Sequence, residues 1–77
     1  MNEELANIKV KFSSYYKYSF TFENDGGYVV TVGGIHDEIY RSSVVANKEY
    51  TIQEVFDELG GSLLVMLNGE ELYSESW

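Results

Sequence analysis

The side chains that most often carry catalysis are scarce in this chain, which contains one histidine and no cysteine. Nucleophilic catalysis requires a serine or cysteine that a positioned base activates. The GGS run at residues 60–62 lacks the Gly-x-Ser-x-Gly spacing of a nucleophile elbow and precedes a strand-like segment. His36 stands beside Asp37 and Glu38 in an expected loop, where we interpret it as a solvated surface side chain. We therefore expect a protein that is not an enzyme.

Metal-ligand patterns are equally weak. His36 and Asp37 are adjacent, and adjacent residues in an extended segment point in opposite directions. The ENDG run at residues 23–26 begins like a calcium loop but lacks the ladder of oxygen ligands and the closing glutamate. No glycine-rich run has the spacing of a phosphate-binding loop. We expect no metal site and no cofactor.

The acidic side chains are numerous and unevenly distributed. The chain has 77 residues and a formal net charge of −8. Residues 1–48 carry six acids and five bases, whereas residues 49–77 carry seven acids and no base. Such an asymmetry favours an electrostatic partner. The alternative is that acidity only keeps a small protein in solution.

The first acidic element is a predicted helix at residues 52–59, where apolar side chains recur at helical spacing. Thr51 and Glu54 form a T-x-x-E capping box at its start, and Gly60 is the expected stop. The face opposite the apolar one carries acids at i, i+3 and i+4. These acids are Glu54, Asp57 and Glu58.

The second acidic element is a predicted hairpin of residues 62–67 and 70–74 around an Asn-Gly turn. In a two-residue register Val65 opposes Leu72. Alternation then places three side chains on one face of the returning strand. These are Glu71, Tyr73 and Glu75. If the helix and the hairpin pack as neighbours, their acids form one negative patch.

The first half of the chain predicts strands at residues 8–12 and 15–23, either separated by a bend at residues 13–14 or joined as one long strand. The aromatic side chains of the second segment alternate, so we expect them to face the core. They are Tyr16, Tyr18, Phe20 and Phe22. Tyr15 points the other way and is expected to be exposed.

A third strand follows at residues 28–32. A three-residue turn at residues 24–26 pairs Phe22 with Tyr28 and keeps apolar side chains on a single face. A fourth strand is expected within residues 38–45.

The predicted order is β-β-β-β-α-β-β, a single α+β domain over residues 1–77 with an antiparallel-rich sheet of five to six strands and one short helix. One short helix can cover only part of one face of such a sheet. Either the strands curl into a partial barrel, or some aromatic surface stays exposed. The acidic N-terminus lacks the apolar segment of a signal peptide, so we expect a cytoplasmic protein without a membrane partner.

We expect no direct binding of nucleic acid, because binding a polyanion draws its affinity from Lys and Arg and this chain has 5 of them against 13 acids. The opposite role fits better: an acidic surface can occupy the basic groove of a nucleic-acid-binding protein. We expect the partner-binding residues to be Glu54, Asp57, Glu58, Glu70, Glu71 and Glu75, with Tyr73 and Trp77 as aromatic anchors.

In size, charge and style, the whole chain resembles the small acidic inhibitors that bacteriophages and other mobile elements use against host defence, anti-CRISPR proteins above all. No diagnostic motif carries this resemblance. It implies an inhibitor, in some members a DNA mimic that occupies the nucleic-acid channel of a CRISPR effector complex, acting in the host cytoplasm. The alternative is a general interaction or assembly module that binds through a sheet edge or an aromatic patch. A monomer and a homodimer both remain open.

Overall fold

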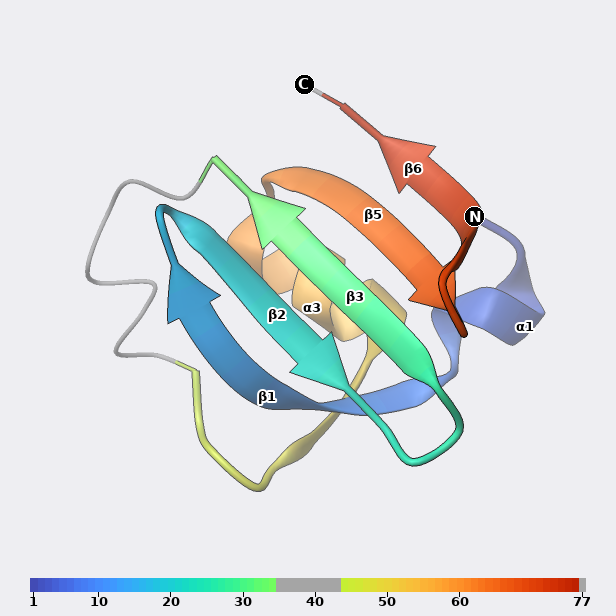
Figure 1. Cartoon of the computed structure of the whole chain (residues 1–77), viewed down its shortest axis with the longest axis horizontal. Helices are drawn as coiled ribbons and strands as arrows, with labels where there is room; N and C mark the ends of the chain where they lie inside the picture. The colour runs from blue at the N-terminus through green and yellow to red at the C-terminus, as the bar shows by residue number, and fades with distance from the viewer. Residues whose placement is uncertain (35–43, 77) are drawn as a thin grey trace.

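The computed structural model describes residues 1–34 and 44–76. Within them the chain forms two helices and six strands (Figure 1). In chain order these are α1 (Glu3–Ala6), β1 (Lys9–Tyr16), β2 (Ser19–Glu23), β3 (Tyr28–Gly33), β4 (Glu49–Thr51), α3 (Ile52–Leu59), β5 (Ser62–Leu67) and β6 (Glu70–Glu75).

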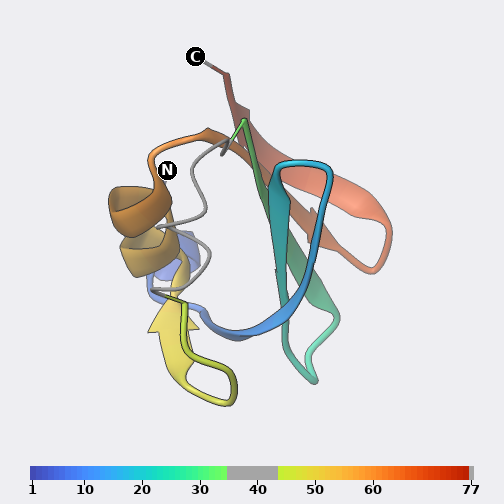
Figure 2. The same cartoon turned by 90° about the vertical axis from the view of Figure 1, so that its left-hand side faces the viewer.

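The strands form one antiparallel sheet in the order β4-β1-β2-β3-β5-β6, which confirms the predicted α+β class. Helix α3 lies across one face of this sheet, behind β2, β3 and β5 in Figure 1. Figure 2 shows that β1 curves away from β2 towards β4, so the sheet wraps partly around the helix. The buried core between them consists of Val10, Phe20, Phe22, Val30, Val32, Tyr50, Ile52, Val55, Leu59, Leu63 and Val65.

Helix α3 has the bounds that the sequence predicts. The Thr51 hydroxyl oxygen accepts a hydrogen bond from the Glu54 N–H at 3.1 Å, and a Glu54 carboxylate oxygen accepts one from the Thr51 N–H at 2.9 Å. Gly60 ends the helix in the left-handed conformation, with a φ of 65°. Both ends are therefore capped, as an eight-residue helix requires because two turns are unstable alone.

The prediction of one strand over residues 15–23 is wrong. Strand β1 continues through a bulge at Ser13 to Tyr16, and the chain turns at Lys17 and Tyr18, whose φ angles are 48° and 66°. Neither residue is of the Asn or Gly type that usually marks such a turn, which is why the pattern concealed it. Tyr16 and Tyr18 consequently point outwards, 71% and 52% exposed, instead of facing the core.

The β2–β3 turn has the predicted length but begins one residue later, so its three loop residues are 25–27. Phe22 pairs with Val30 instead of Tyr28. Gly27 takes the positive φ of 90°, while the Asn24 side-chain Oδ1 accepts from the Gly26 and Tyr28 N–H groups at 3.0 and 3.1 Å. The pairing moves by an even number of residues, so Phe20 and Phe22 stay on the core face.

The predicted register of the β5–β6 hairpin is wrong beyond its first two pairs. Leu67 pairs with Glu70 and Met66 with Glu71, as expected, but Val65 pairs with Tyr73. Leu72 is the extra residue of a bulge and is 45% exposed. One inserted residue exchanges the faces of every side chain that follows.

The predicted fourth strand falls almost wholly on residues 38–43, which lie outside the described residues; Val44 and Val45, its last two, are not in a strand. In the described part of the chain the fourth strand is β4, which pairs with β1 directly before α3. The short helix α1 was not predicted. The side chain of Asn2 caps it by accepting a hydrogen bond from the Leu5 N–H at 2.8 Å.

Candidate interaction surfaces

The three predicted acids of α3 lie on its outer face. Ile52, Val55 and Leu59 are buried against the sheet, whereas Glu54, Asp57 and Glu58 are exposed. Helix α1 contacts α3 on the same side of the sheet and adds Glu3 and Glu4, both exposed. We call these five residues the helical acidic surface. Neither helix carries a base.

Glu54 differs from its neighbours because its carboxylate also caps the helix. The hydrogen bond from the Thr51 N–H is the main cause that lowers the pKa of Glu54, followed by the Thr51 hydroxyl. Weaker contributions come from Lys48 and Lys9. Asp57 accepts a hydrogen bond from the Gln53 side-chain amide at 2.9 Å. Glu54 is therefore partly committed to the fold.

Asp57 and Glu58 occupy the last turn of α3, where the helix macrodipole favours positive charge. No base in that turn offsets them. Each acid in such a position costs about 0.3–1 kcal/mol of stability at low ionic strength. Their position is therefore unfavourable for folding alone.

The predicted acids of the hairpin do not all project from one face of the sheet, so they do not form a single patch with the helical acidic surface. Residues paired across neighbouring strands project from the same face. Glu71 pairs with Met66 and projects from the face opposite α3, whereas Tyr73 pairs with the buried Val65 and projects towards the helix side. The prediction that Glu71, Tyr73 and Glu75 share one face is therefore wrong.

Tyr73 is half-buried, and its hydroxyl donates a hydrogen bond to a Glu75 carboxylate oxygen at 3.3 Å. Partial burial raises the pKa of Tyr73, and the nearby Glu75 carboxylate raises it further. Glu70 is exposed at the hairpin turn. Trp77, the second predicted anchor, lies outside the described residues.

The face of the sheet opposite α3 is not covered by any described element (Figure 2). Its centre consists of half-buried Val29, Thr31, Leu64 and Met66 on β3 and β5. Thr21 and Glu23 continue this face on β2. It is a mixed surface of the kind that an antiparallel sheet commonly presents to water.

Among residues 1–34 and 44–76, the most exposed aromatic side chains are Tyr16 and Tyr18 on the β1–β2 turn, where sequence reasoning did not place them. Lys17 extends over the ring of Tyr16, with its Nζ 5.3 Å from the centroid. Tyr15, expected to be exposed, instead packs against the core with its ring 4.8 Å from that of Phe20. The alternation of apolar and polar residues held the available signal. If Tyr15 faces the core, an unbroken strand would also send the charged Lys17 to the core, so a turn is expected there.

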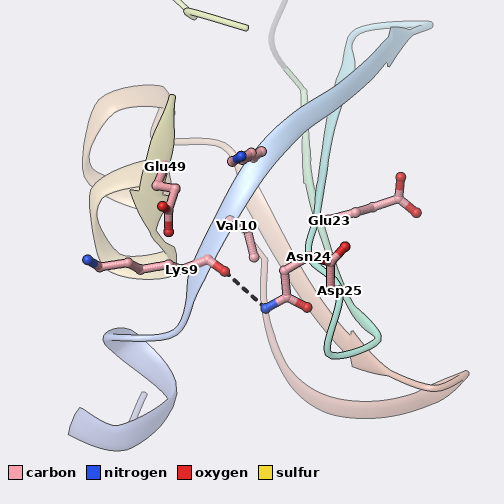
Figure 3. Close-up of a pocket in the computed structure, with 7 residues that line it drawn as sticks. Lys9, Val10, Glu23, Asn24, Asp25 and Glu49 are labelled. Carbon is pink, nitrogen blue, oxygen red and sulfur yellow. Dashed lines mark hydrogen bonds between the residues drawn. The ribbon is translucent and has the colours of Figure 1, made fainter. Parts of the chain in front are cut away.

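A pocket of about 250 Å³ lies between β1, β4 and the β2–β3 turn (Figure 3). Asn24 lies inside it and donates a hydrogen bond from its Nδ2 to the Lys9 carbonyl oxygen at 2.9 Å. The charged lining side chains are of both signs: Lys9, Lys11, Glu23, Asp25 and Glu49. This mixture selects neither anions nor cations, and Asn24 has an evident role in anchoring the turn.

Within residues 1–34 and 44–76, no three or more His, Asp or Glu side chains gather closely enough to hold a metal ion. His36, the candidate base, lies outside these ranges. Neither of the two described helices is long and apolar enough to cross a membrane. Comparisons with protein-family models, with curated proteins and with solved structures found no match to this chain.

Proposed function

We propose that this protein is a non-catalytic inhibitor that presents its helical acidic surface to a basic protein surface of the kind that holds nucleic acid. The observation that carries the proposal is the position of Asp57 and Glu58. They are exposed, uncompensated within their helix turn and placed where the macrodipole disfavours them. A charge placed at a cost to stability is consistent with a trade-off between stability and function, and binding is the function that we propose for it.

The helical acidic surface suits such a role because it is fixed in place. Side chains spaced i, i+3 and i+4 on a helix are about 5–6 Å apart at their Cβ atoms. Glu54, Asp57 and Glu58 thus form a compact row of negative charge on a helix whose opposite face is buried. A preformed row loses little conformational freedom when a partner binds. Placed in a basic groove, it would exclude the phosphates that normally bind there.

The resemblance to phage inhibitors of host defence gives this proposal its context, namely a cytoplasmic target such as a CRISPR effector complex. Complementary charges accelerate association, and salt screens this effect. We therefore expect capture of the target to be fast and sensitive to salt.

The test is affinity capture from a bacterial lysate that is first treated with nuclease and then freed of it, at low and at high salt, with double-stranded DNA as competitor. We expect the captured proteins to bind nucleic acid, to elute with salt and to be displaced by the DNA. A matched control is the Glu23→Lys/Asp25→Lys variant, which changes the net charge as much as Asp57→Lys/Glu58→Lys but at two exposed acids beside the β2–β3 turn, outside α1, α3 and β6. Capture that resists both DNA and salt would refute the proposal.

A second candidate function is a general interaction module that binds through the β1–β2 turn. Tyr16 is 71% exposed, and Lys17 and Tyr18 hold positive φ angles that L-residues rarely adopt. Strained residues that display aromatic rings are a reason to suspect a contact site. The variant Lys17→Asn/Tyr18→Gly relieves the strain and removes one ring. If it loses capture while Asp57→Lys/Glu58→Lys keeps it, the second function is correct.

A further inference from the structure

Strand β6 is a free edge of the sheet. It pairs with β5 on one side, and no other described strand lies beside it (Figure 1). At six residues it is twice as long as β4, the three-residue strand at the other edge. A free edge leaves every second backbone N–H and C=O pair available to an added strand.

The bulged residue of β6, Leu72, lines a pocket. Leu72 contributes to a hollow of about 240 Å³, whose other lining residues are Asn2, Glu4, Leu5, Ile8 and Tyr28. These residues come from α1 with its N-cap residue, the segment before β1, and β3, so the pocket is a product of the fold. Its apolar part suits one aliphatic side chain, and Asn2 and Glu4 make the rest of its lining polar. Strand addition gains its affinity from backbone hydrogen bonds and its specificity from such pockets.

Charge decides which strand can occupy the edge. Strand β6 contains Glu70, Glu71 and Glu75 and no base. Two copies paired through β6 would bring acids close to acids, which is destabilising for cross-strand neighbours. A strand with Lys or Arg on alternate positions would instead complement β6.

We infer that the β6 edge and the Leu72 pocket form a docking site for an extended basic segment of a partner protein, which adds a strand to the sheet and inserts one aliphatic side chain. This site shares Glu4 with the helical acidic surface but includes none of the acids of α3. It rests on strand pairing and on the pocket at Leu72, so its test is distinct from that of the function proposed above.

The probe is a short end-blocked peptide of alternating lysine and valine with a central leucine. We expect it to bind and to slow amide hydrogen exchange at residues 70–75. Two peptides serve as comparisons: one with glutamate in place of lysine, and one N-methylated at alternate backbone amides. Both should lose binding, the first through charge and the second through the lost backbone hydrogen bonds.

The matched protein variants are Leu72→Ala and Val45→Ala. Both side chains are exposed apolar groups, but only Leu72 lines the pocket. Leu72→Ala should weaken binding of the lysine peptide about tenfold, which corresponds to about 1.4 kcal/mol of lost apolar contact. Val45→Ala should leave the affinity unchanged. The Asp57→Asn/Glu58→Gln variant should keep its affinity for the peptide, which separates this site from the α3 surface.

Three results would overturn the inference. The first is equal binding of the N-methylated peptide, because strand addition requires the backbone groups. The second is no binding of the lysine peptide by the wild-type protein. The third is a dimer in sedimentation equilibrium whose β6 amides are protected without peptide, because the occupant would then be a second copy.

Discussion

Helix α3 and strand β6 carry most of the acids in residues 49–77, yet they present them in different ways. On α3, three exposed acids lie on one outer face. On β6, the bulge at Leu72 sends Glu71 to one face of the sheet and Glu75 to the other. The faces of a helix follow from its spacing alone, whereas those of a strand depend on every residue in its register. The helix is therefore the better carrier of a defined charged surface.

The two elements are also held differently. Helix α3 is held by its caps and by side chains buried against the sheet, so Ile52→Ala should remove a large part of the packing between the helix and the sheet. Ile52 is fully buried, and we expect a loss of about 3 kcal/mol in the free energy of unfolding, measured by urea denaturation. Gln53→Ala, on the neighbouring half-exposed position, is the control and should change little. A loss for Ile52→Ala as small as that of the control would show that α3 is not anchored by packing.

Gly27→Ala should destabilise the attachment of the β5–β6 hairpin to the rest of the sheet. Gly27 has a φ of 90°, and a Cβ there would overlap the side-chain oxygen Oδ1 of Asn68 at the neighbouring turn. The Gly27 carbonyl oxygen also accepts the Asn68 N–H at 3.0 Å, so the two hairpins are joined at this point. We expect a loss of about 2 kcal/mol in the free energy of unfolding.

The control is Gly26→Ala, where φ is not positive and the nearest atom is 3.4 Å from the new Cβ. Thermal and urea denaturation of both variants would decide the point. If the two alanines prove equally harmless, the contact between the hairpin turns does not support β6.

The smallest effect concerns the one acid of α3 that also stabilises the fold. The pKa of Glu54 is lowered in the folded chain by the Thr51 hydrogen bonds. Its charge therefore stabilises the fold above the unfolded-state pKa, and this contribution is lost as the pH falls through the folded-state pKa. Glu54→Gln retains a capping side chain without the charge. It should be less stable than wild type at neutral pH and equally stable in acid. A difference in the free energy of unfolding that is the same at both pH values would contradict this.

Much of the fold was predictable because local signals agreed with the final packing. The capping box at Thr51, the stop at Gly60 and the Asn-Gly turn at residues 68–69 each specify their element within a few residues. The errors lie where local chemistry gave no signal. The turn at Lys17 and Tyr18 uses residues that seldom take positive φ, and the bulge at Leu72 depends on pairing across two strands.

The candidate site was predictable to the same extent. Helical spacing placed Glu54, Asp57 and Glu58 on one exposed face, as the structure has them. The sequence could not show whether the helix and hairpin acids form one patch, because the answer depends on where β6 joins the sheet and on the register of its pairing. The sequence also did not show that α1 brings Glu3 and Glu4 to the helix side.

The central claim is that the outer face of α3 is built for binding at a cost to stability. The Asp57→Lys/Glu58→Lys variant tests both the binding and the cost to stability on one sample. Bases suit the last helical turn, so we expect the free energy of unfolding to rise by about 1 kcal/mol and Tm by about 4–8 °C, while capture of the basic target is lost. The Glu23→Lys/Asp25→Lys control should keep capture. A helix variant that still captures the target as the control does would contradict the claim.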